Sequence, residues 1–90
     1  MEDRTRLAFA RWTEAQPAVS AFVHAMLGDR SERDDVLQEV AMAVLESFDQ
    51  YDQSRPFTPW AIGIARNVVL ASVRRARRRP PALEIGRAHV

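Results

Sequence analysis

Apolar residues recur at the three- to four-residue spacing of an α-helix in three successive segments of this chain. No segment alternates apolar and polar residues for long enough to form a strand. The first segment runs from Asp3 to Leu27, and Pro17 is expected to kink it or to begin a second helix there. Ninety residues hold one small domain. We therefore expect an all-α fold, a compact bundle of three to four helices.

The ends of the predicted helices are marked by residues that typically cap or stop a helix. Gly28 is expected to stop the first helix. Ser31 opens a sequence that resembles a capping box, although Asp34 stands where Glu is preferred. Thr58 and Pro59 form a favourable pair to begin the third helix. The second helix should bury Val36, Leu37, Val40, Ala41, Val44, Leu45 and Phe48, and a polar loop should follow it over residues 49–55.

The net charge of +1 conceals a division along the chain. Residues 1–55 contain eleven acids and six arginines, whereas residues 56–82 contain six arginines and no acid. All thirteen basic residues are arginine, a side chain suited to forked contacts with phosphate. The asymmetry predicts a basic face suited to phosphate and an acidic face suited to a basic protein surface.

Catalytic and metal-binding residue patterns are absent from the sequence. There is no cysteine, which excludes disulfides and thiolate metal sites, and the two histidines, His24 and His89, have no nucleophile or ligand pattern around them. We expect no catalytic residue, no metal site and no cofactor. No signal peptide or long apolar stretch is found either, so a cytoplasmic location without membrane association is expected.

Residues 34–40 read Asp-Asp-Val-Leu-Gln-Glu-Val. Periodicity alone favours a solvated helix face for the polar members of this segment. The segment resembles, however, the Asp-Leu-(Val/Ile)-Gln-Glu motif in region 2.2 of bacterial sigma factors. The resemblance implies that the helix docks on the clamp helices, a coiled coil of the largest subunit of core RNA polymerase. It assigns polymerase contacts to Asp35, Gln38, Glu39 and Met42.

The resemblance continues in order along residues 6–81. Residues 48–52 are similar to the end of the family's second helix, residues 57–67 to region 2.3, and residues 73–79 with two following prolines to the basic end of region 2.4. The nearest group is the extracytoplasmic-function (ECF) type. The implied function is to bind core RNA polymerase and to recognise and melt the promoter −10 element, without enzymatic activity or cofactor.

The resemblance also assigns DNA contacts, chiefly to the single-stranded −10 non-template strand. Asn67 can both donate and accept hydrogen bonds to a base edge. Trp60 is expected to pack in the core, which leaves the other two aromatic side chains near the loop ends as better candidates to touch a base. The predicted DNA-binding residues are Tyr51, Phe57, Arg66, Asn67, Arg74, Arg75, Arg77 and Arg78.

Two departures from the family pattern leave alternatives open. Many relatives carry Asp four residues after the Asn, where this chain has Ala71, so one polar contact is expected to be absent. A complete ECF factor also has a second helical domain, which reads the upstream promoter element, whereas this chain stops after region 2. The alternatives are a helical duplex-DNA-binding regulator of the helix-turn-helix kind, and a degenerate sigma factor that only binds proteins such as polymerase or an anti-sigma factor.

The segment at residues 84–90, Glu-Ile-Gly-Arg-Ala-His-Val, does not continue any of these patterns. Back-translated, it reads as a common sequencing-library adapter. The domain is therefore expected to span residues 1–83, with residues 84–90 as a non-native tail.

Overall fold

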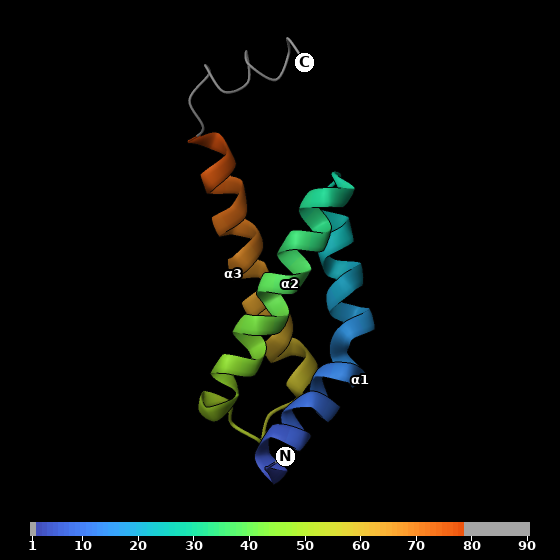
Figure 1. Cartoon of the computed structure of the whole chain (residues 1–90), viewed down its shortest axis with the longest axis vertical. Helices are drawn as coiled ribbons and strands as arrows, with labels where there is room; N and C mark the ends of the chain where they lie inside the picture. The colour runs from blue at the N-terminus through green and yellow to red at the C-terminus, as the bar shows by residue number, and fades with distance from the viewer. Residues whose placement is uncertain (1, 79–90) are drawn as a thin grey trace.

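The computed structural model describes residues 2–78, and three long helices form its fold (Figure 1). They are α1 (Asp3–Met26), α2 (Arg30–Ser47) and α3 (Phe57–Arg77), and a short 3-10 turn, η1 (Phe48–Gln50), extends α2. Residues 2–78 contain no strand. The predicted all-α class is thus confirmed. The 84–90 tail lies outside the described residues.

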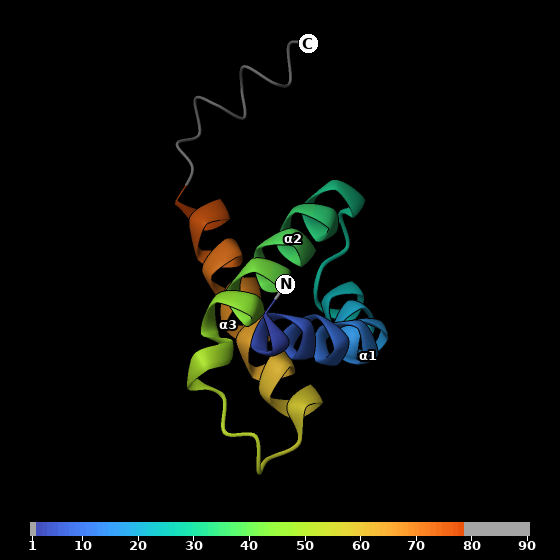
Figure 2. The same ribbon diagram turned by 60° about the horizontal axis from the view of Figure 1, so that its bottom comes forward.

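The three helices run alternately up, down and up, and each packs against the other two (Figure 1). The connection from α1 to α2 is short, whereas the loop from η1 to α3 projects from the bundle (Figure 2). This loop lies at the same end of the molecule as the beginning of α1. Beside the loop, Asp49 of η1 forms an ion pair with Arg4 near the beginning of α1.

The core lies along the axis of the bundle and consists mainly of small side chains. Its largest fully buried side chains are all valines, and alanines fill the positions between them. Leu37, Ala41 and Leu45 pack against this core as partly buried residues, which confirms the predicted inner face of α2. The buried residues are Ala8, Trp12, Ala15, Val19, Val23 and Leu27 from the first helix and the residue after it, Val36, Val40, Val44 and Phe48 from α2 and η1, and Phe57, Ala61, Ala65 and Val69 from α3.

The first helix differs from its prediction in two respects. No second helix begins at Pro17, because buried Ala15 and Val19 hold the turns on both sides of the proline in the core and the helix continues through it. The helix also ends at Met26 without a left-handed glycine. Leu27 adopts an extended conformation and buries its side chain, so this apolar residue, rather than Gly28, ends the helix.

The predicted starts of the other two helices are also wrong. Asp29 is the N-cap of α2, because its Oδ1 accepts hydrogen bonds from the backbone N–H groups of Ser31 (2.8 Å) and Glu32 (3.3 Å). Ser31 therefore lies inside the helix. Pro56 occupies the N-cap position of α3. Pro59 lies within the first turn, where backbone N–H groups have no helical partner and a proline is tolerated.

We expect Asp29→Ala to lower the free energy of unfolding by about 0.5–2 kcal/mol, because two N–H groups of the first turn lose their acceptor. Ser31→Ala is the matched control and should change stability by less than about 0.5 kcal/mol. Urea unfolding followed by circular dichroism measures both. If Ser31→Ala lowers the free energy of unfolding as much as Asp29→Ala does, Ser31 rather than Asp29 is the N-cap of α2.

Candidate protein and nucleic-acid interfaces

The outer face of α2 carries all four residues predicted to bind polymerase. Asp35, Gln38 and Met42 follow one another at intervals of three and four residues, which places them on one side of the helix. Glu39 adjoins them, and all four are exposed, Met42 at 61% of its surface. The opposite side of the helix is the valine face of the core. The structure thus brings these four predicted residues together on one accessible surface.

A groove between α1 and α2 extends this surface. It is lined by Trp12, Gln16, Leu37 and Gln38 among others. A separate hollow between the same two helices contains Phe9, which is 45% exposed, and Leu45. The helical spacing of Phe9 with the buried Trp12 gives no indication that the Phe9 ring faces solvent. The α2 surface therefore combines carboxylates and amides with exposed apolar groups.

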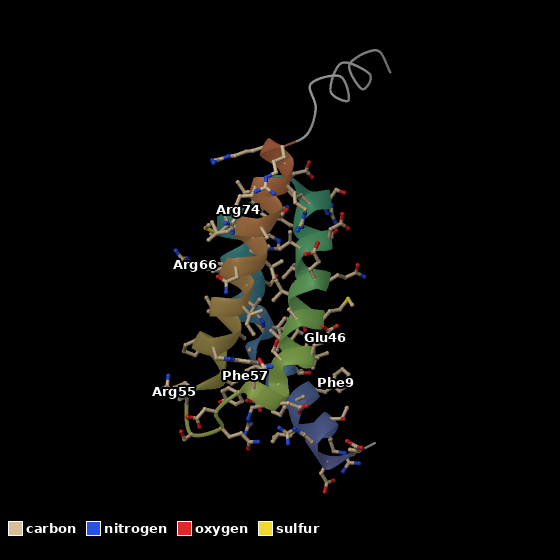
Figure 3. The ribbon with its side chains drawn as sticks, turned by 90° about the vertical axis from the view of Figure 1, so that its left-hand side faces the viewer. Phe9, Glu46, Arg55, Phe57, Arg66 and Arg74 are labelled. Atoms are coloured by element: carbon tan, nitrogen blue, oxygen red, sulfur yellow. The ribbon has the colours of Figure 1, made fainter. Side chains whose placement is uncertain are left out.

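The arginines of α3 lie on another side of the bundle. Asn67, Arg74 and Arg78 follow at intervals of seven and four residues and so share one stripe, with Arg66 and Arg77 beside it. Figure 3 shows Arg66 and Arg74 projecting to the side opposite Glu46 and Phe9. None of these arginines forms an ion pair with another residue of the described chain. We call Arg66, Asn67, Arg74, Arg77 and Arg78 the basic stripe.

Arg75 does not belong to this stripe. Its Nη2 atom lies 3.3 Å from Oε1 of Glu39, with which it forms both an ion pair and a hydrogen bond. One turn earlier, the Ser72 hydroxyl donates a hydrogen bond of 3.5 Å to Oε1 of Glu32. The structure therefore joins one residue predicted to bind DNA to one predicted to bind polymerase, a contact that no local sequence pattern predicts.

Four aromatic side chains form a cluster where the loop meets α3. The Tyr51 ring lies 4.8 Å from Trp60 and 5.3 Å from Phe57 between centroids, and Phe48 lies 5.7 Å from Tyr51. Trp60 packs against the core, as expected, but stays partly exposed, and so does Tyr51. Phe57 is only 8% exposed. The expectation that Phe57 would be more accessible to a base than Trp60 is wrong, because Phe57 begins the helix on its core side.

The loop beside this cluster is held by its own polar groups. The Tyr51 hydroxyl donates a hydrogen bond to the carbonyl oxygen of Arg55. Oδ1 of Asp52 accepts hydrogen bonds from the backbone N–H (2.9 Å) and the hydroxyl (2.7 Å) of Ser54. The pKa of Asp52 lies below its ordinary value of 3.8. The main cause is the hydrogen bond from the Ser54 hydroxyl, followed by the bond from the Ser54 N–H and the charge of the nearby Arg55 guanidinium. Three hydrogen bonds thus fix the loop conformation next to the aromatic cluster.

The remaining polar groups form no reactive constellation within residues 2–78. His24 lies on the exposed side of α1, where its Nδ1–H donates a hydrogen bond of 2.7 Å to the carbonyl oxygen of Ser20. No cluster of three or more histidine and carboxylate side chains in the described chain could hold a metal ion. None of the three described helices is long and apolar enough to span a membrane.

Comparison with models of protein families shows which family this helical bundle belongs to. The model of the Sigma-70 region 2 family matches residues 11–79, a span that begins in α1 and includes α2, the loop and α3. The chain therefore belongs to the sigma-70 region 2 family, whose members are non-enzymatic domains of transcription initiation factors with a general role in RNA polymerase binding and promoter melting. No curated protein and no solved structure matches the chain.

The hydrogen bonds of Asp52 predict a pH dependence of the loop. The folded-state pKa is lowered, so the carboxylate stabilises the loop above its ordinary pKa of 3.8, and this contribution is lost as the pH falls through the lower, folded value. We expect the Ser54 amide proton to shift upfield during a titration from about pH 6 to pH 2 as its hydrogen bond weakens, with a midpoint below 3.8. Two-dimensional NMR measures this, and a midpoint at or above 3.8 would contradict the assignment.

Proposed function

We propose that this chain is region 2 of an ECF-type sigma factor, which binds the clamp helices of core RNA polymerase and holds the single-stranded non-template strand of the −10 element. One observation carries the proposal. The surface similar to region 2.2 and the basic stripe are both exposed, and they lie on different sides of one three-helix bundle. The domain can therefore contact a protein and a DNA strand at the same time, in the cytoplasm where both are found.

The α2 surface suits a basic coiled coil. Asp35 and Glu39 supply negative charge, Gln38 supplies an amide, and Met42 supplies an exposed and adaptable apolar contact. Complementary charge speeds and orients the docking of such partners, while apolar groups contribute to affinity once water is excluded. An anti-sigma factor that blocks initiation would act through the same surface.

The loop and α3 suit an unpaired DNA strand. The basic stripe offers guanidinium groups to phosphates, and the Asn67 side chain has no hydrogen-bond partner among the described residues, so it can bind a base edge or a sugar. Tyr51 and Trp60 are partly exposed aromatic rings at the loop end of the same helix. Capture of an unstacked base offsets the few kcal/mol that unpairing costs, so the melting step requires neither ATP nor metal.

The structure gives less support to a helix-turn-helix regulator. A recognition helix usually reads bases from its N-terminal residues. The N-terminal turns of α3 instead contain Phe57 and Ala61, which are buried, while its arginines lie at the C-terminal end. A module that binds only proteins remains the second candidate. One specific observation favours it, since Ala71 lies one turn beyond Asn67 and provides no polar group to orient the amide.

Binding of a purified clamp-helix fragment to the full chain tests the polymerase contact. We expect Gln38→Ala/Glu39→Ala to weaken binding at least tenfold, or about 1.4 kcal/mol. Gln38→Ala alone should also weaken binding. Because this variant leaves the ion pair between Glu39 and Arg75 intact, it distinguishes a lost contact with the partner from an effect of freeing Arg75. The matched control is Glu14→Ala/Gln53→Ala, an exposed Glu and Gln on another side of the bundle, which should bind as the unchanged chain does. Equal affinities for the unchanged chain and the double variant, with unchanged helicity, would remove the α2 surface from the interface.

Binding to a single-stranded −10 oligonucleotide over a range of salt concentrations tests the DNA contact. We expect Arg74→Gln to reduce the slope of log affinity against log salt by about 0.7, the value for one lost phosphate contact on a single strand. Arg30→Gln, an exposed arginine at the start of α2, should leave the slope unchanged. Tighter binding to duplex DNA than to the single strand would favour the helix-turn-helix alternative.

A further inference from the structure

We propose that Arg75 is a positioning residue rather than a phosphate contact, and that it fixes the direction of the basic stripe by holding the end of α3 against α2 through Glu39. This inference rests on the proposed function and divides the arginine cluster of α3 into two groups with different tasks. The sequence gives no reason for such a division, because Arg74 and Arg75 are adjacent and identical.

The position of Arg75 on the helix separates it from the basic stripe. Successive residues of an α-helix are rotated by about 100° around its axis, so Arg74 and Arg75 point in different directions. Arg75 lies in line with Val68, seven residues earlier, which packs against the core. It therefore projects along the seam with α2, whereas Arg74 projects outward (Figure 3).

The surroundings of Arg75 are acidic. The hollow that it lines between the start of α2 and the end of α3 is also lined by Asp29, Glu32, Asp35 and Glu39. A phosphate brought to Arg75 would meet these carboxylates at close range, where like charges repel. The same carboxylates favour an arginine that stays in the seam. The ion pair with Glu39 is the one that joins α2 to α3 within residues 2–78.

The core does not hold this part of α3 by itself. Val69 is the last fully buried residue of the helix, and Ala76 is exposed. The last turns of α3 extend away from α2 in Figure 1. Beyond Val69, the partly buried Val73 packs against the core, and the polar contacts between the two helices within the described chain are the hydrogen bond of Ser72 and the ion pair of Arg75. With little packing beyond Val73, the direction of the turn that carries Arg74 and Arg78 depends in part on these two polar contacts.

The first measurement compares Arg75→Gln with Arg74→Gln in the full chain, by affinity for the single-stranded −10 oligonucleotide against salt. We expect Arg75→Gln to weaken binding about two- to fivefold, through loss of an exposed ion pair, without changing the salt slope. Glu39→Gln should have the same effect although it removes a negative charge. A slope reduced by about 0.7 for Arg75→Gln, as for Arg74→Gln, would make Arg75 a phosphate contact and overturn the inference.

The second measurement does not depend on DNA. In a double-mutant cycle of Glu39→Gln and Arg75→Gln, the thermal unfolding midpoints should be non-additive by about 1–5 °C, whereas Glu39→Gln and Arg74→Gln should be additive. An additive cycle for the first pair would overturn the inference even if the basic stripe binds DNA. A non-additive cycle together with no DNA binding by the unchanged chain would support the role of Arg75 in holding α3 and would reject the proposed function.

Discussion

The close packing of valine and alanine along the bundle axis is the constraint on which the rest of the structure depends. Val19, Val40, Ala61 and Val69 have no exposed surface, and the interior contains few large side chains apart from the aromatic groups near the loop. Small side chains allow helices to approach closely, so the rotation of each helix about its own axis is fixed by the side that must be buried. Once Val40 faces inward, Gln38 and Met42 must face outward.

Polar contacts add to this packing at the start of α3, where Phe57 is buried, and become more prominent at its end, beyond Val69. At its start, the hydrogen bonds of Asp52 and the ion pair of Arg4 with Asp49 hold the loop. At its end, Ser72 and Arg75 join it to α2. Segments held by exposed polar contacts open at a lower free energy than a packed core does. The end of α3, where exposed polar contacts follow the last fully buried residue, is therefore expected to open at a lower free energy than the bundle does.

The sequence predicts the faces of these helices better than their ends. A face depends on periodicity summed over many residues, so the valine side of α2 follows from the spacing alone. A helix end depends on which of several neighbouring residues caps it. Asp29 and Ser31 can both cap a helix, but Asp29 is the N-cap of α2. The exposed members of both proposed interfaces follow from the same periodicity. The contact between Glu39 and Arg75, 36 residues apart, depends on how the helices cross, which no local pattern contains.

The arginines of the basic stripe form no ion pair within the described chain, so the phosphate contacts proposed for them would not require an existing ion pair to break. Arg74 and Arg78 are one turn apart, and like charges at this spacing destabilise a helix by about 0.2–0.5 kcal/mol. The negative end of the helix dipole offsets part of this repulsion, since both arginines lie in or next to the last turn. A phosphate bound between Arg74 and Arg78 would remove the rest of the repulsion between the two guanidinium groups. Its binding would also release counterions from the DNA. Arg75 is already paired with Glu39, so a phosphate contact would stabilise it less than it would the unpaired arginines of the basic stripe.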